Sequence, residues 1–285
     1  MSIVVAGATG HLGRLVVERL LDRGVAPDEI VAAGRVLDRV ADLGARGVRT
    51  AVFDYDGPAP GVLARGDTFL LTSMPVLGVR VAQHRNALEA AAKAGVARVV
   101  YTSAPHADDT PLVLAPEHKA TEELITASGV PYTIVRNNWY TENYAGTLDQ
   151  ARQTGLLVSS AGAGRVASAT RDDYATGIAA VLSTAGHDNA VYELSGDTAW
   201  DFGELAAALA TALGRDVEYR PVSPEEHLAI LVDAGLDEAT AGFVVAMDGN
   251  IRDGALADAT PELARLAGRP TTPLLDAVRT MAAGS

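Results

Sequence analysis

Short apolar segments alternate with helix-like segments through the first half of the chain. Segments such as IVVA and FLLT are apolar at every position, as strands covered on both faces require. Between them, apolar residues recur at three- and four-residue spacing, which is the pattern of amphipathic helices. Strands are predicted at Ser2–Ala6, Ile30–Ala33, Val48–Phe53, Thr68–Thr72, Arg98–Thr102 and Tyr132–Val135, and helices at Leu12–Arg23, Leu37–Arg46, Val79–Ala94 and Glu117–Ser128. This alternation predicts an α/β fold of the Rossmann type, with a doubly wound parallel sheet.

The alternation loosens after about Gln153. The segment TGLLVSSAGAGRVASA predicts two short strands around a glycine-rich turn, and VYELSG predicts a strand that returns to the main sheet. TRDDYATGIAAVLSTAG and FGELAAALATALG predict helices, and several short helices are expected from Ser223 onward. We therefore expect residues 1–153 to form a Rossmann-type domain, completed by a returning segment near residues 171–196. Residues 154–285 are expected to form a smaller, mainly helical substrate-binding lobe.

Three glycines follow the first predicted strand directly and open the first predicted helix. In VVAGATGHLG they have the spacing G-x-x-G-x-x-G, one residue different from the dinucleotide-binding fingerprint. Glycines permit a tight turn and let the backbone approach a pyrophosphate, which then binds the helix N-terminal amides. A purely structural turn is the alternative, but the strand before and the helix after favour a nucleotide site. The predicted dinucleotide-binding residues of this turn are Gly7, Thr9, Gly10, His11, Leu12 and Gly13.

The end of the second strand distinguishes NAD from NADP. NAD enzymes usually have an acid there, about 20 residues past the glycines, which binds the ribose 2′-hydroxyl. Here the segment reads AAGRVLDR, with Arg35 at the strand end and Arg39 one helical turn later. An arginine suits a 2′-phosphate through charge-assisted hydrogen bonds, so NADPH is the predicted cofactor. A solvated helix start is the alternative interpretation of both arginines.

Two further strand ends are expected to contact the dinucleotide. Asp54, after the third strand, is a candidate acceptor for the adenine amino group, and a turn-forming aspartate is the alternative. Thr72 and Ser73 belong to TSMP at the end of the fourth strand. They are expected near the nicotinamide ribose because ligands of such sheets bind at the carboxyl ends of the strands.

The composition excludes several kinds of site. The chain has no cysteine, which excludes disulfides and thiol catalysis and is compatible with a cytoplasmic location. Its histidines show no metal-ligand spacing, so no metal is expected, and its net charge of −13 opposes nucleic-acid binding. No apolar run has the length of a membrane span, and MSIVVAGATG lacks the basic leader of a signal peptide. The expected partner is a small molecule, and a homodimer stays open.

Four segments resemble the NmrA-like, atypical short-chain dehydrogenase/reductase family. They read GATGHLG, AQHRNALEAAAKAGV, YTSAPHADDTPLVLAPEHKATEELI and VPYTIVRNNWYTENY. Within the family, the chain is most similar to type-2 NAD(P)H:quinone oxidoreductases and triphenylmethane reductases, over roughly residues 1–200. The resemblance implies NADPH-linked reduction of quinones or related conjugated acceptors. The family also contains NAD(P)-sensing regulators without obvious turnover.

The tyrosine and lysine that often serve such reductases, four positions apart, are absent. In the family, a glutamate usually stands four positions after the lysine, and Glu122 of LAPEHKATEEL matches this glutamate. The match puts Leu114 in the tyrosine position and His118 in the lysine position. His118 is a candidate proton donor, with ribose binding or a structural role as alternatives. Ser103, which ends YTS, matches the serine that helps to bind the substrate oxygen. The alternative for Ser103 is a strand-end hydroxyl bonded to the backbone.

The absence of this tyrosine and lysine limits the class of acceptor that the protein can be expected to reduce. Reducing a simple ketone creates an alkoxide, whose conjugate acid is so weak that a positioned proton donor matters greatly. Hydride addition to a quinone gives a delocalised phenolate whose conjugate acid has a pKa near ~10, and water or a modest hydrogen-bond donor can stabilise it. The sequence therefore predicts direct hydride transfer to a planar, quinone-like acceptor, without metal or flavin. An imine, an azo or cationic dye-like compound, or a biosynthetic intermediate is the alternative acceptor.

The segment RNNWYTENY is expected to form the pocket wall beside the nicotinamide. Tyr140 and Asn143 are predicted to face the acceptor, whereas Trp139 is expected to pack in the core. His106 and Asp108 follow the fifth strand, where a surface loop is expected and contact with the substrate is the alternative. An open apolar pocket behind this segment would favour an enzyme, and a filled one would favour an NmrA-like sensor of NAD(P).

Overall fold

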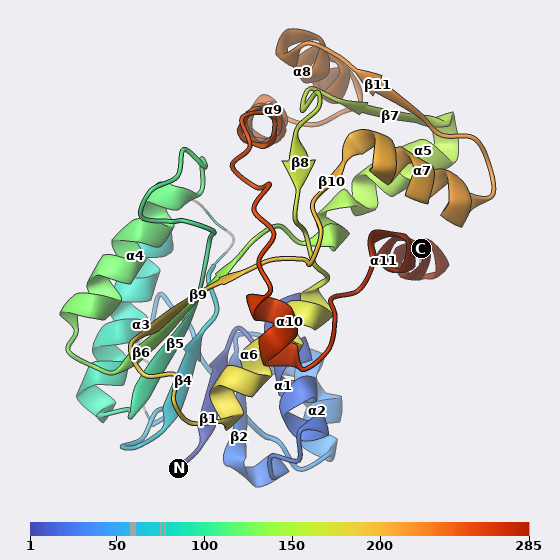
Figure 1. Cartoon of the computed structure of the whole chain (residues 1–285). Helices are drawn as coiled ribbons and strands as arrows, with labels where there is room; N and C mark the ends of the chain where they lie inside the picture. Colours follow the sequence, from blue (N-terminus) through green and yellow to red (C-terminus); the bar gives the residue numbers. More distant parts are fainter. Residues whose placement is uncertain (58–60, 75, 77, 285) are drawn as a thin grey trace.

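The computed structural model of the chain describes residues 1–57, 61–74, 76 and 78–284. Its centre is a sheet of seven parallel strands in the order β3-β2-β1-β4-β5-β6-β9 (Figure 1). Their bounds are β1 Ile3–Ala6, β2 Ile30–Gly34, β3 Arg49–Val52, β4 Thr68–Leu71, β5 Arg98–Ser103, β6 Tyr132–Asn137 and β9 Ala190–Leu194. The predicted doubly wound parallel sheet is therefore confirmed, and every predicted strand is present with only small shifts of its ends.

The strand order positions a binding site. β1 lies between β2 and β4, so the chain builds the sheet toward one edge and then toward the other. Such a reversal opens a crevice at the carboxyl ends of the two neighbouring strands, where open α/β sheets bind ligands. β9 pairs with β6 at the far edge, which confirms the predicted return of VYELSG to the main sheet.

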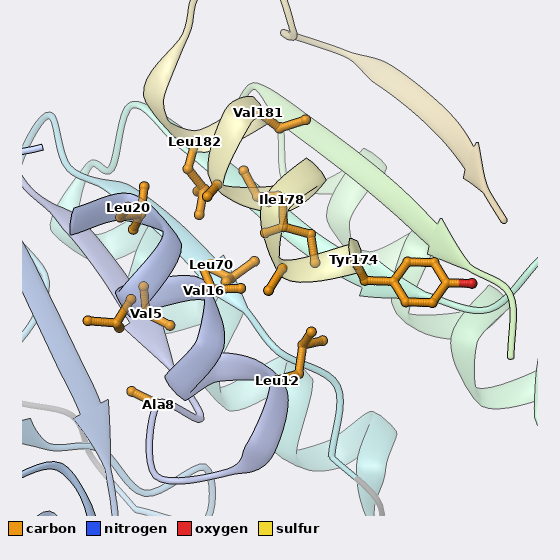
Figure 2. Packing of buried hydrophobic residues seen from close by; sticks show 14 of the residues in the cluster. Val5, Ala8, Leu12, Val16, Leu20, Leu70, Tyr174, Ile178, Val181 and Leu182 are labelled. Carbon is orange, nitrogen blue, oxygen red and sulfur yellow. The ribbon is translucent and has the colours of Figure 1, made fainter. Parts of the chain in front are cut away.

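Helices cover both faces of this sheet. Their bounds are α1 His11–Asp22, the 3₁₀ turn η2 Leu37–Val40, α2 Ala41–Ala45, α3 Arg80–Ala94, α4 Ala115–Ala127 and α6 Arg171–Ser183. Buried side chains of α1, η2, α2 and α6 pack on one face, and those of α3 and α4 on the other. Figure 2 shows Val16 and Leu20 of α1 beside Ile178 of α6 in the first of these layers.

The prediction of one helix at Leu37–Arg46 is wrong in one respect, because this segment folds as two pieces, η2 and α2. The backbone leaves helical values at Val40, where φ is −126°. Val40 and Leu43 are both fully buried against the sheet. Tertiary packing therefore overrides the helical pattern of this segment.

A second hydrophobic core lies away from the main sheet, above and to the right of it in Figure 1. The elements that contribute to it are α5 Ala145–Thr154, β7 Leu156–Ser159, β8 Arg165–Val166, β10 Trp200–Asp201, α7 Phe202–Leu213, β11 Glu218–Pro221, α9 Glu238–Arg252 and α11 Leu274–Ala283. α8 Pro224–Asp233 packs against α9 beside this core. The two short strands predicted around the glycine-rich turn are present, but they do not pair with each other. β7 pairs with β11 in parallel, and β8 pairs with β10 in antiparallel orientation.

The chain crosses between the two cores more than once. α6 begins at Arg171, and its N-cap residue Thr170 forms a capping box with Asp173. α10 (Glu262–Ala267) then packs against α6. Gly177 leaves room for this contact, because a Cβ there would lie 2.7 Å from Leu263 Cδ1.

The last part of the chain is helical, as predicted from Ser223 onward. α9, with 15 residues, is longer than the short helices expected there. Neither α9 nor any other helix in the described part of the chain combines the length and the apolar character that a membrane span needs.

Candidate active site

A cavity of about 380 Å³ opens at the carboxyl ends of the central strands. Its lining follows the ends of β4, β5 and β6, and Leu12 of α1 places it next to the crevice that the strand order creates between β1 and β4. Met247 and Leu256, from the second core, contribute to its wall. The sequence-predicted residues that line it are Leu12, Thr72, Ser73, Ser103, His118, Tyr140 and Asn143.

Close backbone contacts shape the glycine turn after β1. Gly7 has φ +81°, a conformation that favours glycine. A Cβ at Gly13 would lie 2.4 Å from the Gly7 carbonyl oxygen, so a larger residue does not fit there. Gly10, the N-cap of α1, has no side chain to cap the first amides, and the first turn of α1 has no acidic residue. These amides are available to an anion such as a pyrophosphate.

The other predicted residues of this turn have different surroundings. Thr9 packs against Gly34, where a Cβ would lie 2.6 Å from the Thr9 side chain. His11 is exposed at the first position of α1, and Leu12 is buried and borders the cavity. One side of the turn therefore borders the cavity, and the other side faces solvent.

The predicted adenosine-side residues lie at the ends of β2 and β3. Arg35 is exposed, and among the described residues it has no ion-pair partner. Asp54 is half-buried, and its Oδ1 accepts a hydrogen bond from the Asp56 amide at 3.2 Å. This bond is the turn-forming contact that was the alternative for Asp54, although it occupies only one carboxylate oxygen.

Two buried oxygen atoms of the cavity wall lack hydrogen-bond partners among the described residues. Thr72 Oγ1, after β4, and Asn137 Oδ1, at the end of β6, form no hydrogen bond with any described residue. Leaving such an atom unpaired costs roughly 1–3 kcal/mol, so both atoms fit a polar ligand. The neighbouring Ser73 amide donates to Thr102 Oγ1 at 2.8 Å, which fixes the loop. Pro75, the last residue of the predicted TSMP segment, lies outside the described residues.

Ser103, at the end of β5, is hydrogen-bonded to a carboxylate and not to the backbone. Its Oγ donates to Glu122 Oε1 at 2.6 Å, and Arg136 holds the same carboxylate through Nε at 2.9 Å and Nη2 at 2.6 Å. Burial lowers the pKa of Arg136, but hydrogen bonds to Glu122, Glu193 and Asp108 raise it above the usual range. Because the Ser103 proton points to Glu122, its oxygen is free to accept a hydrogen bond from a ligand but not to donate one.

Leu114 and His118 line the cavity one helical turn apart, at the start of α4. Behind His118 lies the fully buried Tyr101 of β5, whose hydroxyl is 2.8 Å from His118 Nδ1. Burial raises the pKa of Tyr101, so the hydroxyl keeps its proton. We assign that proton to the bond with Nδ1, which leaves the ring N–H on Nε2. Sequence reasoning missed Tyr101, although its place two residues before Ser103 puts both on the same face of β5.

Burial and, to a lesser extent, the positive charge of Arg80 lower the pKa of His118 to about 3. The ring is therefore neutral near neutral pH, and it is a hydrogen-bond donor and not a strong acid. Arg80 is itself buried in the cavity wall, where Nε donates to the Met74 carbonyl oxygen at 2.7 Å. Its Nη1 lies 3.5 Å from Glu117 Oε2. Sequence reasoning missed Arg80, because an arginine that opens a helix is ordinarily solvated.

Tyr140 and Asn143 lie in the cavity wall, as predicted. The Tyr140 hydroxyl accepts from Asn137 Nδ2 at 3.2 Å, and Asn143 Oδ1 accepts from Arg171 Nη2 at 3.0 Å. The expected packing of Trp139 against a core is confirmed, but the residue also has a second environment. Trp139 is half-buried where the chain leaves β6 for the second core, so it packs against that core and also borders the cavity.

His106 and Asp108 do not line the cavity. His106, with φ 48°, faces Glu193 at 3.6 Å and Asp258 at 3.2 Å. Asp108 pairs with Arg136 at 2.7 Å. Both residues therefore stabilise the loop after β5, in agreement with the surface loop expected there. Among the residues that the structure describes, no three or more His, Asp or Glu gather in a way that suits a metal ion.

Comparisons with known proteins agree with this geometry. Residues 7–185 match a family described as NAD(P)H-binding. The chain is 41% identical over 278 residues to quinone oxidoreductase 2 of Escherichia coli (strain K12), covering 97% of both chains. The crystal structure of an NADPH-dependent quinone oxidoreductase from E. coli complexed with NADPH matches with a TM-score of 0.93 at 40% identity, covering 98% of this chain and 99% of that one. Triphenylmethane reductase of Citrobacter sp. complexed with NADP(H) matches with a TM-score of 0.92 at 35% identity, covering 98% and 100%.

The similarity is longer than the sequence segments indicated. It was expected over roughly residues 1–200, but these relatives match nearly the whole chain, including the C-terminal helices. The family match begins at Gly7 in the glycine turn and extends beyond α6. The chain therefore belongs to the NAD(P)H-binding family and, within it, to the NmrA-like atypical short-chain dehydrogenases/reductases.

Proposed function

We propose that the chain is an NADPH-dependent oxidoreductase that transfers hydride directly to a quinone-like or other conjugated acceptor. One observation carries the proposal: the cavity at the strand ends joins an uncapped helix N-terminus to a wall whose described residues include the buried cation Arg80 but no lysine and no carboxylic acid. The similarity to NADPH-dependent quinone oxidoreductase of E. coli over nearly the whole chain supports it.

In this proposal the two parts of the chain have separate roles. Residues 1–153, completed by the segment near residues 171–196, form the dinucleotide-binding domain, and residues 154–285 form the substrate-binding lobe. The pairing of β9 with β6 supports the first assignment. The contribution of Met247 and Leu256 to the cavity wall supports the second.

The cofactor would bind across the carboxyl ends of the strands. The glycine turn and the first amides of α1 would bind its pyrophosphate, and Arg35 would pair with the 2′-phosphate. Asp54 keeps one carboxylate oxygen for the adenine amino group. Thr72 and Ser73 would border the nicotinamide ribose, where the unpaired Thr72 Oγ1 supplies a hydrogen-bonding group.

When bound, NADPH supplies a hydride, which is two electrons and one proton, and the acceptor takes a second proton from water to give the reduced quinol. The protein orients the acceptor and stabilises its anion. Tyr140 and Asn143 would border the acceptor ring, and neutral His118 would offer the Nε2 hydrogen. The positive charge of Arg80 favours the developing phenolate. Leu114 supplies only apolar surface at the position where other reductases have a proton-donating tyrosine. No strong acid is needed there, because the conjugate acid of the phenolate has a pKa near ~10 and water can protonate it.

The alternative is an NAD(P)-sensing regulator with little or no turnover. A sensor needs no room for an acceptor, so an open pocket is the sign of an enzyme. The cavity is open beside Leu114, Trp139 and Met247, which favours the enzyme.

The experiment that tests the proposal measures NADPH oxidation with a panel of quinones and without added flavin. Fluorescence titration with NADPH and NADH accompanies it. Quinone-dependent turnover, with tighter binding of NADPH than of NADH, is the expected result. Tight dinucleotide binding without turnover on any acceptor would contradict the enzyme and favour the sensor.

A further inference from the structure

A second cavity of about 600 Å³ lies within the second core, and the reaction proposed above does not use it. Its wall is largely apolar and includes Leu157, Ile230, Leu231, Phe243, Val244 and Ile251. Trp139, Asn143 and Met247 line both cavities, so the two spaces share a wall. Met247 is unbranched and flexible, which makes this shared wall adaptable.

Polar side chains form a buried network on one side of the second cavity. Asp248 and His227 are 7% and 4% exposed, and Asp248 Oδ2 lies 3.0 Å from His227 Nδ1. The same oxygen accepts hydrogen bonds from Ser159 Oγ at 2.8 Å and from the Ser160 amide at 2.7 Å. His227 Nε2 has no such partner among the described residues, so it is the ring nitrogen available to a ligand.

Ser160, His227 and Asp248 have the composition of a nucleophilic triad but not its geometry. Ser160 Oγ lies 3.2 Å from His227 Nδ1, the same nitrogen that faces Asp248. A triad requires the serine and the carboxylate on opposite ring nitrogens, so that the histidine relays a proton. The network is therefore part of a binding wall and not a hydrolytic centre.

Tyr144 is an independent sign that the second cavity binds a ligand. It is 8% exposed, it lines the cavity, and its hydroxyl forms no hydrogen bond with a described residue. Burial and the Asp248 carboxylate raise the pKa of Tyr144, whereas the nearby Trp139 indole lowers it to a smaller extent. The hydroxyl thus keeps its proton without a proper acceptor, and a polar group on a ligand would remove that penalty.

We propose that the second cavity binds the apolar extension of an elongated acceptor whose conjugated ring is reduced in the first cavity. This inference rests on the proposed function and names its substrate class: an amphipathic quinone-like molecule with an alkyl or prenyl chain. The chain would pass the shared wall of Trp139 and Met247 and lie among the apolar residues beyond it. An oxygen or nitrogen substituent on the chain would meet Tyr144 and His227.

The test compares two quinones with the same ring, one without a chain and one with a decyl chain, by their kcat/KM below the concentration at which the second forms micelles. Each buried methylene contributes about fourfold in affinity, and several are buried here. Wild-type protein is therefore expected to favour the decyl compound at least about tenfold. Val244→Trp and Ala234→Trp fill the second cavity without touching the first, so each is expected to abolish the preference and to leave turnover of the chainless quinone unchanged. Val244→Ala is the matched control and is expected to keep the preference.

The results that would overturn this inference differ from those that would contradict the proposed function. Equal kcat/KM for the two quinones in wild-type protein, or a preference that both filling variants retain, overturns the inference while chainless-quinone turnover still supports the reductase. Absence of turnover with every quinone contradicts the reductase. In that case, equilibrium binding of the two quinones to the NADPH-loaded protein makes the same comparison, and equal affinities overturn the inference.

Discussion

The Tyr101 hydroxyl lies 2.8 Å from Nδ1 of His118, behind the histidine and away from the acceptor. Leu114 occupies the place one helical turn before His118 where the family pattern puts a catalytic tyrosine. Tyr101 can therefore fix the tautomer of His118, but it does not present its own proton to the cavity. This relationship suits acceptors whose reduced form is already a stabilised anion.

The first prediction is that His118→Ala lowers benzoquinone turnover by no more than about tenfold, since acid catalysis typically contributes 10²–10⁴-fold and a neutral imidazole does not supply it. Initial rates at saturating NADPH measure the effect. Tyr101→Phe is the matched control, because it acts only through His118 and is expected to have an equally small effect. A loss near the upper end of that range for His118→Ala would mean that the histidine donates a proton.

The second prediction concerns stability in acid. Burial is the main cause that lowers the pKa of both His84 and His118 to about 3, whereas an unfolded histidine titrates near ~6.5. The Met74 amide donates to His84 Nε2 at 3.3 Å, a bond that the protonated ring cannot accept. Below pH ~6.5 the unfolded chain binds protons that the folded chain does not, so the stability present above that pH falls as the pH drops toward the folded values.

Urea unfolding at neutral and mildly acidic pH measures this dependence. The free energy of unfolding is expected to fall by at most about 1.4 kcal/mol per pH unit for each histidine. His84→Asn is expected to make the dependence shallower. A free energy that stays constant between pH ~7 and ~5.5 would show that the two rings bind protons as readily in the folded protein as in the unfolded chain.

The third prediction assigns the electrostatic stabilisation to Arg80. Arg80→Gln is expected to lower kcat/KM for benzoquinone on the order of 10²-fold, as removal of a transition-state stabiliser does. Arg80→Lys keeps the charge but, like the Gln variant, loses the Nε bond to the Met74 carbonyl. It is therefore expected to recover much of the activity. Equal losses in the two variants would mean that Arg80 acts only by holding the loop after β4.

The fourth prediction tests the choice of dinucleotide. Arg35→Ala is expected to weaken NADPH binding by roughly tenfold or more and to leave NADH binding nearly unchanged, because only NADPH carries a 2′-phosphate for charge-assisted hydrogen bonds. Fluorescence titration with both dinucleotides measures the difference. Arg46→Ala, at the exposed end of α2, is the control and should change neither affinity. Equal losses for the two dinucleotides in Arg35→Ala would remove the 2′-phosphate assignment.

The sheet could be predicted because its strands are covered on both faces, which leaves apolar runs such as IVVA that no other element explains. The return of β9 could also be predicted, since its composition is that of a strand. The break at Val40 could not, because packing against the sheet determines it. The pairing of β7 with β11 could not be predicted either, because it joins segments that are far apart in the sequence.

The site could be predicted where local sequence determines it. The glycine turn and the strand ends at Thr72 and Ser103 follow directly from the strand pattern. Arg80 and Tyr101 could not be found in this way, because their importance comes from burial by other elements. The second cavity has the same origin, since α5, α8 and α9 enclose it only after they pack together.

The most direct test of the central claim is a single-turnover reaction between NADPH-loaded protein and benzoquinone, without added flavin. It is run with ordinary NADPH and with NADPH deuterated at C4 of the nicotinamide. Quinone-dependent oxidation of the bound NADPH, slowed by the deuterium because that C–H bond breaks in the transfer, is the predicted result. Bound NADPH that stays reduced in the presence of quinone, or that is oxidised only after a flavin is added, would contradict direct hydride transfer.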